Sequence, residues 1–161
     1  MRTETSKGFL RLQYKAPDYQ FGQVELDFEL QPHRTIVQSV IEVVPSPHTA
    51  ASHPEVALIL DGQDLEFISL RVSGQAHRHV EITPERMVIH GLPNKGKQKF
   101  QIEIKTTCVP DKNTSLMGLY VSRGNFFTQC EAEGFRKITY FLDRPDVMAR
   151  YRVTLRARKE E

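Results

Sequence analysis

Two glutamates, Glu131 and Glu133, are the residues whose type and spacing point most directly to chemistry. They stand two positions apart, so on an extended backbone their carboxylates would face the same way, with the amide of Gln129 close by. Such a group could bind a cation, act as an acid and base, or be solvated. Glycosidases also use two carboxylates, but spacing alone does not place a sugar between these two. A solvated or salt-bridged role is therefore favoured on chemistry alone. The nearby cationic partners are Arg136, Lys137 and Arg144.

Other motifs that carry chemistry are absent from the sequence. It contains no His-Glu-x-x-His, no Gly-x-Ser-x-Gly, no phosphate-binding glycine loop and no Cys-x-x-Cys. His77 and His79 form a close pair but lack the third ligand of a catalytic zinc site, so we interpret them as surface histidines. Cys130 has no histidine base near it in sequence, which favours a small buried side chain over a nucleophile.

Length and composition limit the classes of function. The 161 residues, 39% hydrophobic and 26% charged, fit one globular domain with its own core. The net charge is only +2, and no basic block or long apolar run predicts binding to nucleic acid or to a membrane. The first seven residues are polar, unlike a secretory signal, and two cysteines are too few for a disulfide framework. We therefore expect a cytoplasmic protein with reduced thiols.

The elements that must position these side chains are predicted to be strands. Residues 24–30 alternate apolar and acidic side chains, as a half-buried strand requires, and no segment sustains a helical apolar stripe. Residues 58–60 and 65–67, separated by Asp-Gly-Gln-Asp, predict a hairpin, and residues 151–158 predict a final strand with one face buried. We expect a single all-β domain over residues 1–161, built from antiparallel sheets packed face to face. The other predicted strands cover residues 35–44, 56–60, 65–72, 86–89 and 100–105.

The sequence around Glu131 and Glu133 resembles that of a known family. The string Thr-Gln-Cys-Glu-Ala-Glu-Gly-Phe-Arg at residues 128–136, followed by Asp-Arg-Pro-Asp at 143–146, closely resembles aminopeptidase N. These are zinc metallo-aminopeptidases of the gluzincin group, and the likeness is to their bacterial, plant and apicomplexan branch. Tyr-Lys-Ala-Pro-Asp-Tyr at 14–19 and Asn-Thr-Ser-Leu-Met-Gly-Leu-Tyr at 113–120 agree more weakly. The sequence departs from the branch at Met117 and Phe127, where glutamate and cysteine are common.

The resemblance implies an architecture for the parent enzyme. Its N-terminal domain is an all-β, saddle-shaped assembly that covers the active site. Its zinc ligands, its catalytic glutamate and a Gly-x-Met-Glu-Asn loop belong to a following thermolysin-like domain, which this sequence lacks. The resemblance also implies further strands after Glu161, so we expect a truncated domain that alone holds no zinc and hydrolyses no peptide.

The resemblance further implies that Gln129 and Glu131 bind substrate. An aminopeptidase must recognise a free, protonated α-amine, and a carboxylate accepts its hydrogen bonds with charge assistance. Glu131, together with the glutamate of the Gly-x-Met-Glu-Asn loop, would hold the ammonium, and Gln129 would add an amide oxygen. No residue of this chain is expected to be catalytic or to bind metal. Glu133, Arg136, Asp143 and Arg144 are interpreted as an ion-pair network that holds the loop.

Two other functions remain open on the sequence, a freestanding non-catalytic β-sandwich that binds peptide or carbohydrate and a purely structural interaction domain. Loss of the strands implied after Glu161 would also leave an open sheet edge along the final predicted strand, which predicts self-association through that end of the molecule. Arginines oppose such association by charge repulsion, so it should strengthen with salt. They are Arg150, Arg152, Arg156 and Arg158.

Overall fold

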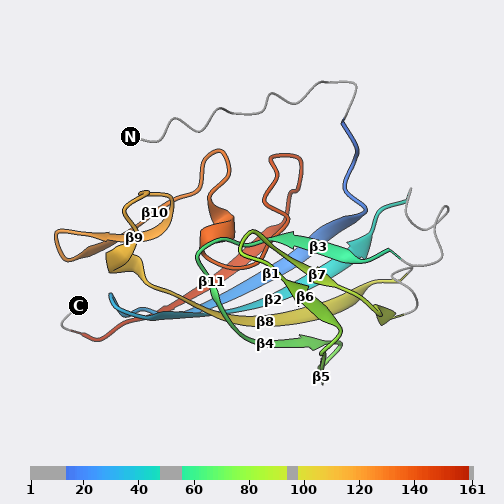
Figure 1. The fold of residues 1–161 in the computed structure, drawn as a ribbon, viewed down its shortest axis with the longest axis horizontal. Coiled ribbons are helices and arrows are strands. Elements are labelled where there is room, and N and C mark those ends of the chain that lie inside the picture. Colours follow the sequence, from blue (N-terminus) through green and yellow to red (C-terminus); the bar gives the residue numbers. More distant parts are fainter. Residues whose placement is uncertain (1–13, 48–55, 94–97, 160–161) are drawn as a thin grey trace.

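The computed structural model describes residues 14–47, 56–93 and 98–159, and almost all of the regular structure in these ranges is strand (Figure 1). The described residues include two short 3-10 turns, η3 (Pro110–Lys112) and η4 (Phe135–Lys137). None of the helical segments described is long and apolar enough to cross a membrane. The prediction of an all-β fold is confirmed.

The largest element is a six-stranded sheet in the order β11-β1-β2-β8-β4-β5. Its central strands are long and antiparallel, because residues 30–34 form a tight reversal between β1 and β2 and β8 then pairs along β2. The strands are β1 (Tyr19–Glu29), β2 (Thr35–Pro45), β4 (Glu66–Val72), β5 (Gln75–Ala76), β8 (Phe100–Cys108) and β11 (Arg150–Arg156).

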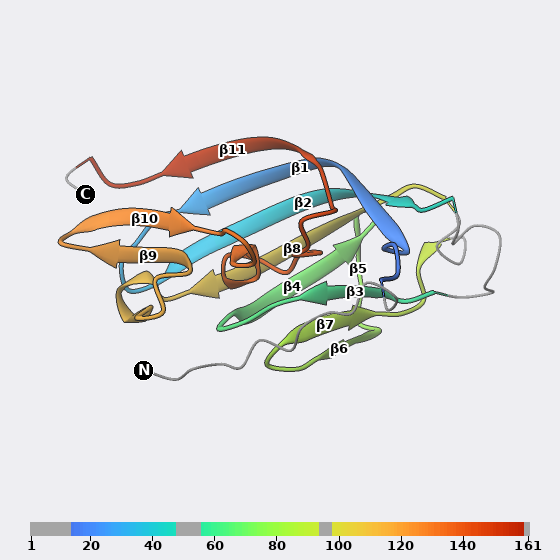
Figure 2. The ribbon, with the colours of Figure 1, turned by 90° about the horizontal axis from the view of Figure 1, so that it is seen from above.

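Two smaller sheets lie over one face of the large sheet (Figures 1 and 2). One has the order β3-β7-β6, and the other is the hairpin of β9 and β10. The strands are β3 (Leu58–Asp61), β6 (Val80–Ile82), β7 (Arg86–Ile89), β9 (Gly118–Ser122) and β10 (Asn125–Gln129). The core forms between the layers, where alternate side chains of β1, β2, β3, β7 and β8 are excluded from solvent. Its fully buried members include Val24, Ile41, Leu58, Leu60, Met87, Ile89, Ile102 and Ile104.

The predicted hairpin of residues 58–60 and 65–67 is wrong. β3 pairs with β7 and β4 pairs with β8, so the turn between them crosses from the small sheet to the large one. The Asp61 backbone bonds instead to Phe141, through N–H···O contacts of 2.7 and 3.0 Å. Gly62 then passes the Tyr140 ring so closely that a Cβ there would lie 2.2 Å from a ring carbon. Phe141 and Tyr140 lie about eighty residues later in the sequence. Their contacts with Asp61 and Gly62 determine the path of the chain here, and not the local Asp-Gly sequence that predicted a hairpin turn.

The last strand also differs from the prediction. β11 pairs in parallel with β1 at the edge of the sheet, and all seven of its residues are exposed rather than half-buried. Val153 is 52% and Leu155 64% exposed, although their neighbours Leu26 and Phe28 on β1 are buried. Among the described residues no second layer covers β11 as it covers β1. The apolar–polar alternation therefore predicted the position of the strand correctly, but it wrongly predicted that one face of the strand is buried.

The β9–β10 hairpin is absent from the strands predicted by the sequence. Its turn residues Arg123 and Gly124 both have positive φ, 50° and 79°, the conformation of a two-residue hairpin turn. Asn-Gly or Asp-Gly commonly marks such a turn, and Arg-Gly is a weaker signal. The loop predicted over residues 109–115 is present and contains η3.

Truncation of a central core side chain should destabilise the domain. Ile102 is fully buried on β8, and we expect Ile102→Ala to lower the free energy of unfolding by about 2–5 kcal/mol, because a cavity would remain. The matched control is Ile59→Ala on β3, where the side chain is 48% exposed. Urea denaturation of both variants measures the difference. Equal losses would contradict the assignment of the core.

Candidate functional site

Gln129 and Glu131 lie where β10 ends and a turn over residues 131–134 leads into η4. Both residues are exposed, and Gln129 Nε2 donates to the backbone oxygen of Glu131 at 3.4 Å. The extended backbone assumed for Glu131 and Glu133 is therefore wrong, because the chain has already turned. The structure nevertheless brings Gln129 and Glu131 together at the end of one strand.

The two glutamates have different surroundings. The Glu133 carboxylate accepts a hydrogen bond from Arg136 Nη2 at 2.8 Å. Within residues 14–47, 56–93 and 98–159, no side chain or backbone donor bonds to the Glu131 carboxylate, which faces solvent. Glu133 thus carries a structural charge pair, and Glu131 offers a carboxylate that can accept hydrogen bonds from a ligand.

Arg136 joins this turn to the segment around Asp143. Its Nε donates to Asp143 Oδ2 at 2.8 Å, and its backbone N–H donates to the same oxygen at 3.2 Å. The Asp143 backbone N–H in turn donates to Asp61 Oδ2 at 3.2 Å. The predicted network therefore contains Glu133, Arg136 and Asp143, whereas Arg144 pairs with Asp146 instead.

The electrostatics of this network follow from its partial burial. Burial raises the pKa of the Asp61 carboxyl, although the neighbouring Arg136 guanidinium acts to lower it. Burial would lower the pKa of Arg136, but its hydrogen bond to Asp143 and the charges of three surrounding carboxylates outweigh that effect and leave the pKa raised. The guanidinium is therefore a permanent cation, and Glu131 is not one of the carboxylates that shift its pKa.

Two glycines allow the turn to pack. A Cβ on Gly134 would lie 2.8 Å from the Gln129 carbonyl oxygen and 2.9 Å from Cys130 Cα. A Cβ on Gly118 would lie 2.5 Å from Lys137 Cβ, and the residue has a φ of +73°. The turn thus approaches both strands of the hairpin more closely than any larger residue would permit.

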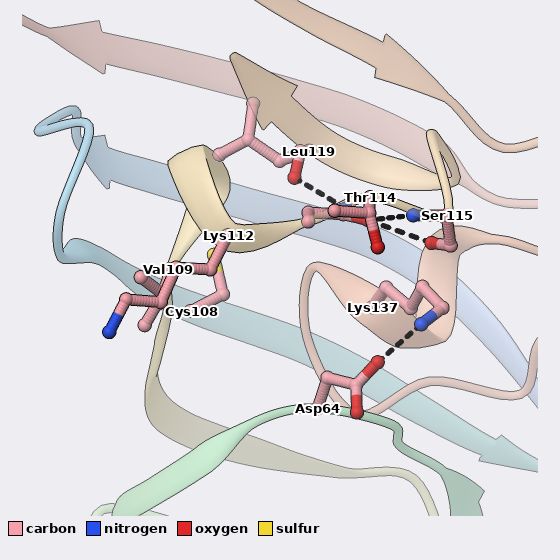
Figure 3. Close-up of a pocket in the computed structure, with 9 residues that line it drawn as sticks. Asp64, Cys108, Val109, Lys112, Thr114, Ser115, Leu119 and Lys137 are labelled. Carbon is pink, nitrogen blue, oxygen red and sulfur yellow. Dashed lines mark hydrogen bonds and ion pairs between the residues drawn. The ribbon is translucent and has the colours of Figure 1, made fainter.

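A cavity of about 370 Å³, lined by both polar and apolar side chains, lies between η3 and η4 (Figure 3). The Asn113 side chain shapes its wall, because Nδ2 donates to the carbonyls of Met117 and Leu119 at 2.7 and 2.9 Å. Lys137 is paired with Asp64 across the cavity, so its charge is compensated. Neither Gln129 nor Glu131 lines this cavity. The lining residues are Asp64, Cys108, Val109, Lys112, Asn113, Thr114, Ser115, Leu119 and Lys137.

Neither cysteine is suited to nucleophilic chemistry. Burial raises the pKa of the Cys108 thiol to about 11 and also raises that of Cys130, which is partly buried beside the turn. Both are free thiols in the structure. Because the thiolate is the reactive form, a raised pKa keeps them protonated near neutral pH.

The histidines in the described ranges do not form a zinc site. His77 and His79 lie between β5 and β6 rather than within a strand, and a ring nitrogen of His77 contacts the His90 carbonyl oxygen at 2.8 Å. In the described part of the chain, no three side chains of histidine, cysteine, aspartate or glutamate lie where they could share a metal ion. The side chains that the structure describes therefore do not fit a catalytic zinc, which needs three protein ligands.

The described residues thus form an all-β domain that carries Gln129 and Glu131 at the end of β10 and brings no set of metal ligands together. The profile of the Peptidase M1 N-terminal domain matches residues 12–161. This chain belongs to that family. Aminopeptidase N of Haemophilus influenzae is 41% identical over 154 residues, and aminopeptidase N of Escherichia coli is 38% identical over 157 residues.

The relatives are much longer than this chain. The alignments cover 96% and 98% of the chain but 17% of each of those two relatives. Among solved structures, Legionella pneumophila aminopeptidase A in complex with aspartic acid superposes with a TM-score of 0.78 at 29% identity, covering 89% of this chain and 16% of that one. An M1 zinc metallopeptidase from Deinococcus radiodurans shares the fold, with a TM-score of 0.73 at 15% identity over 89% of this chain and 33% of that one.

Substitution of Gly134 should displace the turn that carries Glu131. The added methyl group of Gly134→Ala would overlap backbone atoms of Gln129 and Cys130, so we expect a loss of about 1–3 kcal/mol of unfolding free energy. Amide chemical shifts should change from residue 129 to residue 136 and stay constant in β2. Wild-type stability and shifts in this variant would show that the turn has room to move.

Proposed function

We propose that this domain is the substrate-binding cap of a zinc-dependent aminopeptidase, which releases N-terminal amino acids from peptides. The observation that carries the proposal is the exposed Glu131 carboxylate, unpaired among the described residues and held beside Gln129 at the end of β10. Membership of the Peptidase M1 N-terminal domain family and identity to two proteins named aminopeptidase N support it.

The chemistry of the pair suits a free α-amine. An ammonium group has three N–H donors, and a carboxylate that accepts one of them forms a charge-assisted hydrogen bond. Gln129 Nε2 already donates to the Glu131 backbone, which leaves Gln129 Oε1 to accept a second bond from the ligand. An amide nitrogen within a peptide carries no charge and one N–H, so it binds less well. The pair would thus select the free end of a chain.

In this proposal the domain contributes binding and not bond cleavage. The zinc and its ligands would belong to a thermolysin-like catalytic domain of the whole enzyme, where the metal activates the attacking water. Glu131 would fix how far the substrate enters, so that the first peptide bond reaches that centre. A freestanding domain that binds peptide or carbohydrate is less well supported, because the relatives that match nearly the whole chain are named as aminopeptidases.

Removal of the Glu131 charge should weaken amine recognition. In the full-length enzyme we expect Glu131→Gln to lower kcat/KM for aminoacyl substrates by about 10–150-fold, which corresponds to the roughly 1.5–3 kcal/mol of a charge-assisted hydrogen bond. Gln129→Ala should have a smaller effect, because a neutral partner is lost. The control is Glu29→Gln, at an exposed position at the end of β1. A change of less than twofold in Glu131→Gln would exclude it as the amine anchor.

We also propose that the 161-residue chain self-associates through β11. An apolar groove of about 380 Å³ runs between β11 and the β9–β10 hairpin, and the outer edge of β11 pairs with no strand among the described residues. A strand from a second copy could pair with that edge and cover the exposed apolar side chains. The side chains that line the groove come mainly from β1, β10 and β11. They include Leu26, Phe28, Phe126, Phe127, Val153 and Leu155.

This association should depend on salt. Arg152 and Arg156 already pair with Glu25 and Asp27 of β1, but both stay exposed and would repel their counterparts in a second copy. We therefore expect the dimer fraction in sedimentation velocity to rise between 0.05 and 0.5 M NaCl, on the order of the range over which screening becomes strong. Val153→Lys should abolish it, whereas Thr154→Lys on the opposite face should not. A strictly monomeric chain at high protein and salt concentration would contradict the proposal.

A further inference from the structure

Arg136 makes more polar contacts than any other side chain near the candidate site. Besides the bonds to Glu133 and to the Asp143 carboxylate, its Nη2 donates to the Asp143 backbone oxygen at 3.1 Å. Its own backbone oxygen accepts from the Gln63 N–H at 2.9 Å. The residue therefore joins three separate parts of the chain, namely the turn over residues 131–134, the segment around Asp143 and the turn after β3.

The segment that carries Arg136 is also attached to the hydrophobic core. Phe135, the residue before Arg136, packs edge-on against Phe141 with 4.6 Å between ring centroids, and Phe141 packs against Phe21 of β1 at 4.9 Å. The backbone next to Arg136 is thus anchored by the packing of Phe135, and the guanidinium itself is held by Asp143. Only its bond to Glu133 reaches out to the turn that carries Glu131.

The geometry requires the fork of an arginine. Nε and Nη2 donate to different acceptors, one on Asp143 and one on Glu133, from a single rigid plane. A lysine would keep the positive charge but present a single ammonium, which could not reproduce both contacts in one plane. The charge and the geometry of Arg136 can therefore be separated by experiment.

We propose that Arg136 is a positioning residue for amine recognition: it binds the Glu133 carboxylate, and this fixes the turn so that the Glu131 carboxylate is the one that faces the substrate. This inference rests on the proposed function. Arg136 acts through Glu131 and touches no substrate itself. Loss of the fork would release Glu133, whose carboxylate lies two residues from Glu131, and let the turn sample other conformations. A small displacement of a binding group lowers catalysis strongly, because the reacting bond is then misplaced.

A double-mutant cycle in the full-length enzyme tests the inference. We expect Arg136→Lys to lower kcat/KM for substrates with a free α-amine by about tenfold, and by less than about twofold when Glu131→Gln is already present, because residues that act through one another are not additive. Glu133→Gln should give a smaller loss with the same dependence on Glu131. The Glu133 variant keeps the core contacts of Arg136, so it remains informative if Arg136→Lys fails to fold.

The matched control is Arg144→Lys. Arg144 is also paired with an aspartate, and its side chain is 34% exposed against 25% for Arg136, but it makes no contact with the turn over residues 131–134. It should leave kcat/KM unchanged in both backgrounds. If Glu131→Gln is strongly impaired but the losses of Arg136→Lys and Glu133→Gln simply add to it, the positioning role is wrong and the proposed function stands. If Glu131→Gln is as active as wild type, both are wrong.

Discussion

The burial of one face of the six-stranded sheet is the constraint on which the rest of the structure depends. Alternation along β1, β2 and β8 places Val24, Ile41 and Ile102 on one side, and each is completely excluded from solvent. Such side chains destabilise the fold unless a second layer covers them. The β3-β7-β6 sheet, η4 and the β9–β10 hairpin supply that layer, and turns and loops connect them along the chain.

The candidate site is a product of those connections. Gln129 ends a strand of the covering layer, and the chain turns directly after it, because the segment that begins with η4 brings Phe135, Ile138 and Phe141 to the core. Gly134 allows the turn to pass within contact distance of the strand it has just left. The polar groups of the turn then remain at the surface, where Arg136 determines which of its carboxylates is paired. A site built in this way is as rigid as the packing beneath it.

Much of the fold could be predicted from the sequence, because period-two alternation reports directly which side chains share a face. It located β2, β3, β4, β7 and β8 to within about three residues, and it located β1 except for the first part of the strand. It could not assign partners: Asp61 pairs with Phe141, and β11 with β1, through contacts that no local pattern encodes. The candidate site was predicted only through the resemblance of residues 128–136 to the family. Spacing alone suggested that Glu131 and Glu133 were equivalent, whereas their difference arises from one guanidinium and a turn that strand periodicity does not describe.

The parallel pairing of β1 with β11 bears on the order in which the domain folds. Asp27 and Arg156, which pair across these strands, are 129 residues apart in sequence. Closing so long a loop costs entropy before any contact is gained, so this pairing belongs to the late steps of folding. During synthesis, β1 leaves the ribosome long before β11 exists, and until then its outer edge is open on the side away from β2. A row of negative charge lies beside this unpaired edge, on Glu25, Asp27 and Glu29 of β1. The charge would keep nascent chains apart until the arginines of β11 pair with β1 and neutralise it.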